Sequence, residues 1–327
     1  MTWELRWHPF RAEWVLFTSH RGDRPWIGEM VADEEPRVPE NNALGPSGRR
    51  LSDTNPDYRG IFVFTNDLPV FAAAAPTPAL GDDLYRARRA AGTAEVVCYH
   101  HDPHRSVADL DDDEATAVVT TWRERTAALQ HHPEVAHVLI FENRGAAVGT
   151  SNPHPHCQIY AGALVYGTMA REAEVAAAYH ARTARSLLAD VVARERSGPR
   201  VVSEGRHFFA CVPWFARYAY EVHILPHTPA TSLLDLDDDA CRSLALVMRD
   251  VVRRYDALWG IRMPYVLAVH QAPVGQHPHY PFHLELHPPL RAPGLMKYLA
   301  GPEIGGGSMT NESDPDQKAA ELRGALP

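Results

Sequence analysis

The sequence lacks a long apolar run and lacks an excess of basic charge. No stretch approaches the roughly 18 uninterrupted apolar residues of a membrane-spanning helix, and residues 1–8 carry charge where a secretion signal has its apolar core. Lys and Arg number 32 against 41 Asp and Glu, which argues against non-specific binding to nucleic acid or to an anionic membrane. We expect a cytoplasmic protein in which a local cluster of cations must hold any anionic ligand.

Cysteine is also scarce. The four cysteines, Cys98, Cys157, Cys211 and Cys241, are far apart and form no Cys-x-x-Cys pair, so neither a disulfide framework nor a thiolate zinc site is indicated. Histidine is abundant by contrast, with 19 residues, many of them crowded into three short stretches. The length of 327 residues, with 45% hydrophobic and 22% charged residues, is typical of a folded protein with a sizeable core.

An internal repeat is the strongest organisational signal in the chain. The pentapeptide Asp-Leu-Asp-Asp-Asp occurs at residues 109–113 and again at 235–239. Each copy precedes a segment with helical periodicity, 114–129 in the first case and 240–258 in the second. Both segments are predicted to be helices, because acidic residues at these positions supply an N-cap and favourable charge at the positive end of a helix.

The flanks of the two pentapeptides repeat as well. Each copy shows a strand-like run, a histidine, the pentapeptide with its helix, a second strand-like run and a His-x-[His/Glu] pair. The corresponding segments are 95–99 and 221–225, His104 and His227, 137–141 and 265–269, and His154/His156 and His283/Glu285. Acidic helix starts are common, so coincidence is the alternative, but the shared order favours two diverged copies of one module.

The repeat predicts an α+β fold of two fused half-barrel modules, mainly antiparallel sheet with packed helices, covering roughly residues 60–165 and 205–290. Residues 170–196, rich in Ala, Arg and Glu, are predicted to form one long connecting helix. A Gly-rich turn at 305–307 and a helical tail at 316–326 follow the second module. The predicted domains are 1–165 and 166–327.

The segment 143–160 carries the chemistry. If residues 153–160 are extended, the strand period of two places His154, His156, Gln158 and Tyr160 on one face. A lone histidine in a strand is more often a core residue. Here an imidazole with an ordinary pKa near 6.5 is aligned with other polar groups, and it can attack phosphorus without a separate base. Residues just upstream allow backbone N–H groups to approach a phosphate: Gly145, Gly149 and Ser151.

With three further stretches, this segment resembles the galactose-1-phosphate uridylyltransferase family, the hexose-1-phosphate branch of the histidine triad superfamily. The three stretches are Ser-His-Arg-Gly-Asp-Arg-Pro-Trp at 19–26, Asn-Pro-Asp-Tyr-Arg-Gly-Ile-Phe-Val-Phe-Thr-Asn-Asp at 55–67, and 288–303. The resemblance covers about residues 5–325. It implies a pair of fused histidine-triad-like modules, in agreement with the internal repeat.

The resemblance implies an enzyme that transfers UMP from UDP-glucose to galactose 1-phosphate through a uridylyl-histidine, in a ping-pong reaction. His156 is the implied nucleophile. Gln158 stands where hydrolytic members of the superfamily carry a third histidine, and it would hydrogen-bond the phosphoryl oxygens. No organic cofactor is implied.

Substrate contacts are also implied by position. Arg21 and Arg24 would neutralise the diphosphate, although in isolation they are typical of a solvated turn. Phe64, Asn66 and Asp67 would contact uracil and ribose, although Asn66-Asp67 is also a typical turn former. The phosphate pocket would include Asn143, Gly149 and Ser151, and the hexose phosphate would meet Lys297, Tyr298 and Glu303. Family members usually place another residue at Pro302, so the sugar preference stays open.

Family members commonly carry a metal near the nucleophile, bound by a Cys-x-x-Cys pair and two histidines. The cysteine positions correspond here to Asn41 and Leu44, and only His104 and His154 keep their places. Two imidazoles alone make a poor structural zinc site, which normally has four ligands. We therefore expect this first metal site to be empty.

A second family metal site keeps four candidate ligands. These are Glu172, His270, His283 and Glu285, with Glu285 where some members have histidine. Carboxylate and imidazole together suit one divalent zinc or iron ion. The alternative is a hydrogen-bonded histidine cluster between sheet and helix.

Two other functions stay open. A nucleotide phosphorylase or adenylyltransferase of the same superfamily would use the same histidine chemistry on adenine nucleotides. A non-catalytic nucleotide-binding or metal-sensing protein is disfavoured, because both His156 and Gln158 are intact. The expected partners are the small-molecule substrates, and the exposed edges of half-barrels favour a homodimer.

Overall fold

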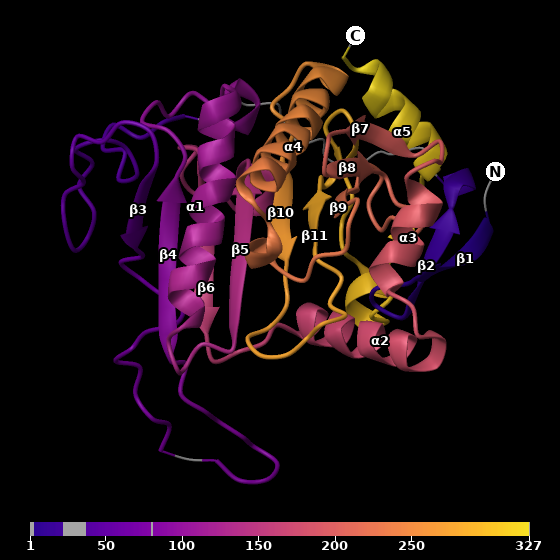
Figure 1. Cartoon of the computed structure of the whole chain (residues 1–327). Helices are drawn as coiled ribbons and strands as arrows, with labels where there is room; N and C mark the ends of the chain where they lie inside the picture. The colour runs from indigo at the N-terminus through magenta and orange to yellow at the C-terminus, as the bar shows by residue number, and fades with distance from the viewer. Residues whose placement is uncertain (1–2, 22–36, 80, 327) are drawn as a thin grey trace.

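A nine-stranded sheet runs across the computed structural model, which describes residues 3–21, 37–79 and 81–326 (Figure 1). Every neighbouring pair of its strands is antiparallel. In spatial order the strands are β3 (Phe62–Thr65), β4 (Gly92–Cys98), β6 (His156–Gly162), β5 (His137–Arg144), β10 (Tyr265–His270), β11 (His283–His287), β9 (Val222–Pro226), β8 (Phe208–Cys211) and β7 (Val201–Glu204).

The strand order confirms the two predicted modules and shows that they share one continuous sheet. The first half runs β3-β4-β6-β5, the second half repeats it in mirrored order as β10-β11-β9-β8, and β5 pairs with β10 at the join. The predicted division at residue 165 falls between β6 and the next helix and stays a prediction.

Strand register corrects the predicted alignment of the two copies. Phe141 pairs with Gln158 in the first half, and Ala268 pairs with Glu285 in the second. Adding 127 to both residue numbers of the first pair gives the second pair, and the same addition takes His156 to His283. The predicted match of His156 to Glu285 differs from this one by two residues, and it would require unequal shifts for the two strands of each pair.

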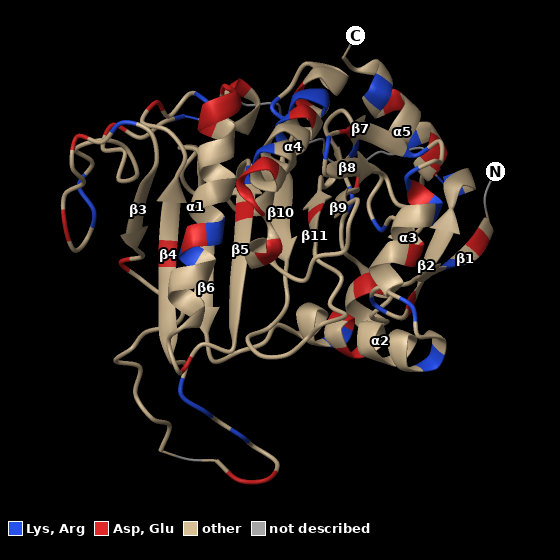
Figure 2. Cartoon of the chain, viewed as in Figure 1, with Lys and Arg blue, Asp and Glu red and all other residues tan. Residues whose placement is uncertain are grey.

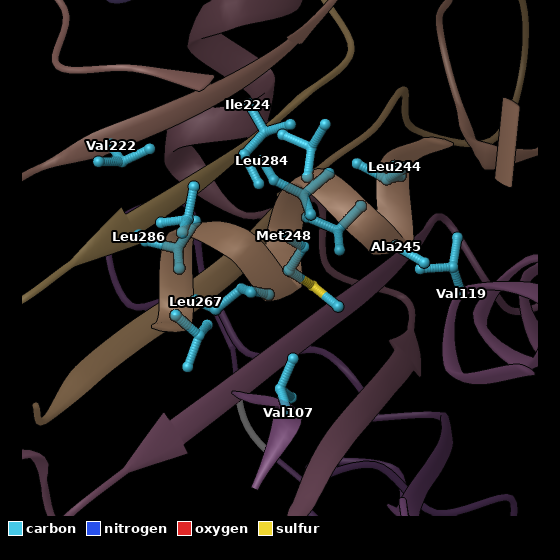
Figure 3. Close-up of a cluster of buried hydrophobic side chains, with 14 of the residues drawn as sticks. Val107, Val119, Val222, Ile224, Leu244, Ala245, Met248, Leu267, Leu284 and Leu286 are labelled. Atoms are coloured by element: carbon cyan, nitrogen blue, oxygen red, sulfur yellow. The ribbon is translucent and has the colours of Figure 1, made fainter. Parts of the chain in front are cut away.

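Two long helices, α1 (Asp112–Gln130) and α4 (Asp238–Trp259), cover one face of the sheet (Figure 1). As predicted, the pentapeptides cap them. The Asp111 carboxylate accepts the N–H of Asp113 and Glu114, and the Asp237 carboxylate accepts the N–H of Ala240. Apolar side chains of α4, among them Leu244 and Met248, pack against the strands beneath (Figure 3). The strand side chains in this cluster include Leu267 of β10 and Leu284 and Leu286 of β11.

The acidic helix starts also pair with arginines of the other copy, and Figure 2 colours the charged positions along the two helices. Arg249 of α4 contacts Asp112 of α1 at 2.6 Å. Arg123 of α1 contacts Asp238 of α4, also at 2.6 Å. At least one partner of each pair is well exposed, and exposed pairs contribute little to the free energy of unfolding. The pairs connect α1 and α4 in both directions.

The opposite face of the second half is covered by the N-terminal hairpin and two shorter helices. β1 (Trp3–His8) and β2 (Glu13–Thr18) form a small sheet with β14 (Thr310–Asn311). Phe10, which follows β1, packs with Phe209, Phe215 and Leu225. The corresponding face of the first half carries a small cluster, Tyr58, Val96 and Cys98. The remaining elements are β12 (Leu290–Ala292), β13 (Leu295–Met296) and the tail helix α5 (Pro315–Gly324).

The predicted single connecting helix is wrong. The structure has two, α2 (Gly167–Thr183) and α3 (Leu187–Glu195). Ala184 has the left-handed φ of 54°, which ends α2, and the Ser186 hydroxyl accepts the Ala189 N–H and starts α3. Propensity alone does not reveal such a break. Among the described residues, no helix combines the length and the apolar character needed to span a bilayer.

Candidate active site

The β6 strand presents the predicted polar face. Cys157 and Ile159 point into the core beneath the helices, whereas the alternate residues His156, Gln158 and Tyr160 are only partly buried on the other side. Asn143 lies beside the start of β6, because it is two residues beyond Phe141, the partner of Gln158 in β5. The first half of the sheet therefore offers a polar surface away from its helices.

The His156 ring is held in one orientation by the backbone. Its Nδ1 lies 2.7 Å from the carbonyl oxygen of His154. Because a carbonyl only accepts, Nδ1 carries the proton and Nε2 keeps its lone pair. Burial lowers the pKa of His156, and the hydrogen bond to His154 opposes this in part. The ring is therefore a neutral imidazole at pH 7, the form that acts as a nucleophile.

The family resemblance implies that His156 is the nucleophile, and on that expectation its lowered pKa has a measurable consequence. Protonation of Nε2 removes the attacking lone pair, so kcat/KM falls on the acid side as His156 protonates. Because burial lowers this pKa, we expect the acid limb of the kcat/KM profile for UDP-glucose to lie below pH 6.5, the ordinary value for histidine. An acid limb above pH 7 would contradict this environment for His156.

Gln158 is oriented by its neighbour on the strand. The Tyr160 hydroxyl lies 3.1 Å from the Gln158 Oε1 and donates to it. With Oε1 engaged, the amide nitrogen is the group that Gln158 offers to a ligand. The Tyr160 ring is itself held edge-on against Phe141, with ring centroids 4.8 Å apart.

The glycine loop after β5 is pinned beside this face. Gly145 has φ of 92° and leaves no room for a side chain, since a Cβ there would lie 2.9 Å from Pro264. The Thr150 hydroxyl donates to the Asn143 carbonyl at 2.6 Å and closes the loop. Gly149 has φ of 82° with open space around it, and Ser151 is exposed. These positions are compatible with the predicted phosphate pocket, and their roles stay predictions.

The predicted uridine residues lie on the same surface. Phe64 pairs with Val96, and Val96 pairs with Gln158, so the three side chains form one row across β3, β4 and β6. Strands lie about 4.8 Å apart, which places Phe64 roughly 10 Å from Gln158. The ring of Phe64 is covered by the Arg50 guanidinium at 4.3 Å from its centroid.

Asn66 and Asp67 follow β3 and are engaged within the protein. The Asn66 Oδ1 accepts the Leu68 N–H, as in a turn. The Asp67 carboxylate accepts from Arg50 at 2.7 Å and from Ser52 Oγ at 2.6 Å. Burial opposes the ionised form, yet these donors hold the pKa of Asp67 below its usual value. Arg50 was not predicted from the sequence, because no motif or regular spacing of residues points to it.

The remaining predicted substrate residues gather on the second half of the molecule. Lys297 Nζ lies 3.1 Å from Glu303 Oε1, and both side chains contact Thr310. Burial works against ionisation, but these donors lower the pKa of Glu303 to about 2. Tyr298 is 52% exposed.

Arg21 also lies on that side. It follows β2, and its Nε is 3.4 Å from Glu312, one residue beyond β14. Its side chain is half exposed, as the turn interpretation predicts. Arg24 lies outside the described residues.

The first metal position is occupied by a hydrogen-bonded network. His154 is buried, with its Nδ1 3.0 Å from the Asn42 amide nitrogen and its Nε2 2.8 Å from the Tyr58 hydroxyl. Burial, with the neighbouring His156 ring, lowers the pKa of His154 to about 4. Both nitrogens of this ring thus have protein partners. His104 is exposed on its loop, and the described residues show no metal-binding group that joins it to His154.

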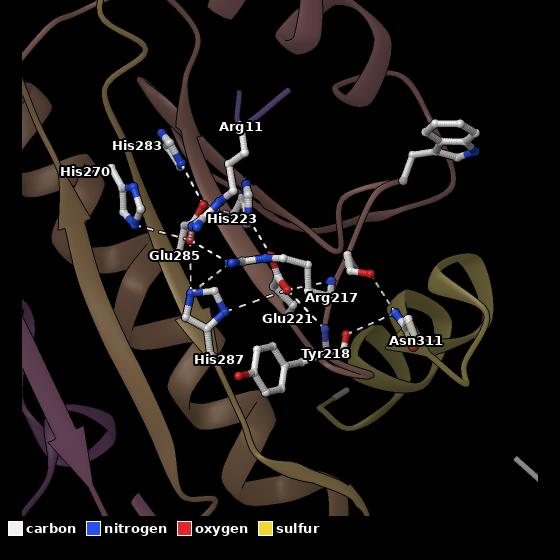
Figure 4. A network of polar contacts seen from close by, with 12 residues as sticks. Arg11, Arg217, Tyr218, Glu221, His223, His270, His283, Glu285, His287 and Asn311 are labelled. Carbon is white, nitrogen blue, oxygen red and sulfur yellow. Dashed lines mark hydrogen bonds and ion pairs between the residues drawn. The ribbon is translucent and has the colours of Figure 1, made fainter. Parts of the chain in front are cut away.

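The second predicted metal set is brought together between β10, β11 and α2. One ligand atom from each of Glu172, His270, His283 and Glu285 lies within 4.8 Å of the others, and all four are buried. His270 contacts Glu172 at 3.0 Å. It also contacts Glu285 at 3.2 Å (Figure 4). Burial lowers the pKa of His270, but these carboxylates outweigh it and raise the value to about 9. The donor set suits a divalent zinc or iron ion.

Two arginines that sequence reasoning missed also meet this set. Arg11 and Arg217 contact the same oxygen of Glu285, at 2.5 and 2.9 Å (Figure 4). Arg11 is 274 residues away from Glu285 along the chain, and Arg217 is 68 residues away. No local pattern in the sequence could have indicated them.

Two family descriptions match nearly the whole chain: the galactose-1-phosphate uridyl transferase N-terminal domain at residues 2–165 and its C-terminal domain at 172–327. The galactose-1-phosphate uridylyltransferase of Haemophilus influenzae is 33% identical over 97% of this chain and 93% of its own length. That of Rattus norvegicus is 31% identical over 98% and 86%.

Solved structures agree. A structure described as a uridylyltransferase has a TM-score of 0.82 at 26% identity, covering 99% of this chain and 98% of its own. An ADP-glucose phosphorylase from Arabidopsis thaliana, with a TM-score of 0.80 at 22% identity and 99% and 98% coverage, shares the fold.

Proposed function

The chain belongs to the galactose-1-phosphate uridylyltransferase family, and from this premise we propose that it transfers UMP from UDP-glucose to galactose 1-phosphate, giving UDP-galactose and glucose 1-phosphate. The observation that carries the proposal is the His156 ring, whose Nδ1 donates to the His154 carbonyl so that Nε2 is free to attack. Gln158 stands next to it on the same face of β6.

The proposed reaction has two displacements at one phosphorus. Nε2 of His156 attacks the uridylyl phosphorus, a P–N bond forms, and the P–O bond to the glucose 1-phosphate phosphoryl oxygen breaks. A phosphate oxygen of galactose 1-phosphate then attacks the same phosphorus and the P–N bond breaks, which restores the free imidazole. Two inversions leave the phosphorus with overall retention. The Nδ1–H···O=C bond supports the positive ring while it carries the uridylyl group.

The surroundings supply binding. Phe64, in one row with Gln158, is proposed to contact the uracil, and the open glycine at 149 suits a phosphate. Gln158 offers an N–H to the phosphoryl oxygens and, as a neutral amide, cannot protonate a wrong leaving group. Lys297 and Glu303 are proposed to meet the hexose phosphate.

We also propose that the protein is a homodimer and is located in the cytoplasm. Lys297 and Arg21 lie on the second half, and His156 lies on the first. The hairpin β1–β2 exposes a set of apolar side chains, which is typical of an interface: Trp3, Leu5, Trp7 and Trp14. A second copy seated on this hairpin would cover them.

Isotope exchange tests the proposed substrate. Labelled glucose 1-phosphate should enter UDP-glucose in the presence of the protein without any second hexose phosphate, because the first displacement is reversible. Exchange that proceeds with ADP-glucose and not with UDP-glucose would instead support the adenylyl-transferring alternative, and no exchange with either would support a non-catalytic nucleotide-binding protein.

We propose further that Glu172, His270, His283 and Glu285 hold one zinc or iron ion with a structural role. These residues join α2 to β10 and β11, and an ion there would tie the helix to the sheet. The sequence-based expectation that the position of His104 and His154 is empty is retained, supported by the partners of His154.

Removal of this ion should affect stability more than turnover. Metal bound only by the folded state adds to the free energy of unfolding, and the set lies in the second half of the sheet, whereas His156 lies in the first. We expect chelator-treated protein to show a lower Tm with kcat reduced by less than about twofold. Thermal unfolding and initial rates on the same sample measure this, and an equal Tm after complete metal removal would favour the hydrogen-bonded histidine cluster.

A further inference from the structure

A second group of potential metal ligands lies on the other side of Glu285. It comprises His8, the last residue of β1, with Glu221 just before β9 and His223 within it. One ligand atom of each lies within 4.8 Å of the others, and all three residues are fully buried. Figure 4 shows Glu221 and His223 side by side, and their side chains are 2.9 Å apart.

The histidines of this group have nitrogens without partners. In the described part of the chain, neither Nδ1 nor Nε2 of His8 has a hydrogen-bond partner, although both are buried, and Nδ1 of His223 is in the same state. Buried polar atoms are almost always satisfied, and a pair of orphaned nitrogens on one ring needs an explanation. A bound ion supplies one.

Packing alone does not explain a histidine at this position. The His8 ring lies against Phe215, with centroids 4.4 Å apart, and against Phe10 at 6.3 Å. Phenylalanine would fill this aromatic setting without burying two polar atoms. We therefore expect that position 8 carries a histidine because its ring nitrogens bind a ligand.

The donor chemistry of the group suits a transition metal. Burial, followed by the Arg11 charge, lowers the pKa of His8 and keeps it in the neutral form that binds metals. The guanidiniums of Arg11 and Arg217 are both paired with the Glu285 carboxylate. Two imidazoles with one carboxylate form a donor set typical of Zn²⁺ or Fe²⁺ sites.

We propose that His8, Glu221 and His223 bind a divalent transition-metal ion, Zn²⁺ or Fe²⁺, at a position separate from the Glu172 set. Glu285 lies between the two positions, since its Oε1 is 3.1 Å from His283 Nε2 and 3.5 Å from His223 Nε2. The ion would satisfy a His8 nitrogen and tie the N-terminal hairpin to β9.

Co²⁺ is the probe, because its visible spectrum reports nitrogen and oxygen ligands in a tetrahedral site. The test background is His270→Gln, in which the Glu172 set has lost a ligand. We expect this variant to bind one Co²⁺ with a tetrahedral spectrum. Adding His8→Phe should weaken binding by about 100-fold or more, since the loss of a group that only supports a ligand already costs up to about 100-fold. Co²⁺ binding that persists unchanged in the double variant would overturn the proposal, as would no binding in His270→Gln.

A stability measurement covers the case in which His270→Gln does not fold. In the otherwise unchanged chain, His8→Phe removes two unsatisfied atoms, so without metal its Tm should equal or exceed that of the wild type. Added Zn²⁺ should raise the Tm of the wild type more than that of His8→Phe. Equal Zn²⁺-dependent shifts in both proteins would contradict the site. Neither measurement depends on transferase activity, so its outcome is separate from that of the proposed function.

Discussion

Replacing His156 by alanine is expected to abolish exchange of labelled glucose 1-phosphate into UDP-glucose. The Nε2 of His156 is the atom that forms the bond to phosphorus, and its orientation by the His154 carbonyl has no substitute once the ring is gone. Loss of a nucleophile in covalent catalysis costs on the order of 10⁴-fold or more in kcat. Exchange kinetics at saturating UDP-glucose measure the effect.

Two controls separate chemistry from folding. His131, an exposed histidine at the end of α1, is the matched control, and His131→Ala should exchange at the wild-type rate. His156→Gly leaves a space the size of the ring, so added imidazole should restore part of the transfer. Near wild-type exchange by His156→Ala would remove this residue from the mechanism.

Truncation of Gln158 should slow turnover by at least about 100-fold, the scale of one lost transition-state donor. Its amide lies on the His156 face of β6 and is oriented by the Tyr160 hydroxyl. Charge on the phosphoryl oxygens grows in the transition state, so the donor matters more there than in the bound substrate. Steady-state kinetics of Gln158→Ala should therefore show a fall in kcat with a modest change in KM.

Gln276, exposed on the loop after β10, provides the matched glutamine control, and Gln276→Ala should leave both constants unchanged. An unchanged kcat in Gln158→Ala would mean that the amide does not contact the reacting phosphoryl group. A rise in KM alone would indicate a binding role.

The features that were predictable from sequence are those set by local periodicity and capping. The alternation from His156 to Tyr160 fixed which side chains share a face of β6, and Asp111 and Asp237 cap their helices as the pentapeptides indicate. The match of His156 to His283 was missed, because it depends on pairing between strands distant in the sequence.

The groups around the histidines were not predictable for the same reason. Asn42 and Tyr58 reach His154 across 112 and 96 residues, and His8 meets His223 only once the N-terminal hairpin packs on the second half of the sheet. These contacts arise from tertiary packing, and the residues involved show no spacing that a single sequence could reveal. Resemblance to a family supplied the candidate ligands of the Glu172 set but not the neighbours that surround them.

The central claim is a uridylyl group carried on Nε2 of His156, and mass measurement tests it most directly. The protein is mixed with UDP-glucose in the absence of an acceptor, quenched in alkali and digested. The account predicts one added uridylyl group on the peptide that contains His156, and its release as UDP-galactose when galactose 1-phosphate is added before the quench. Label on a different residue, or exchange that proceeds with no labelled peptide, would contradict it.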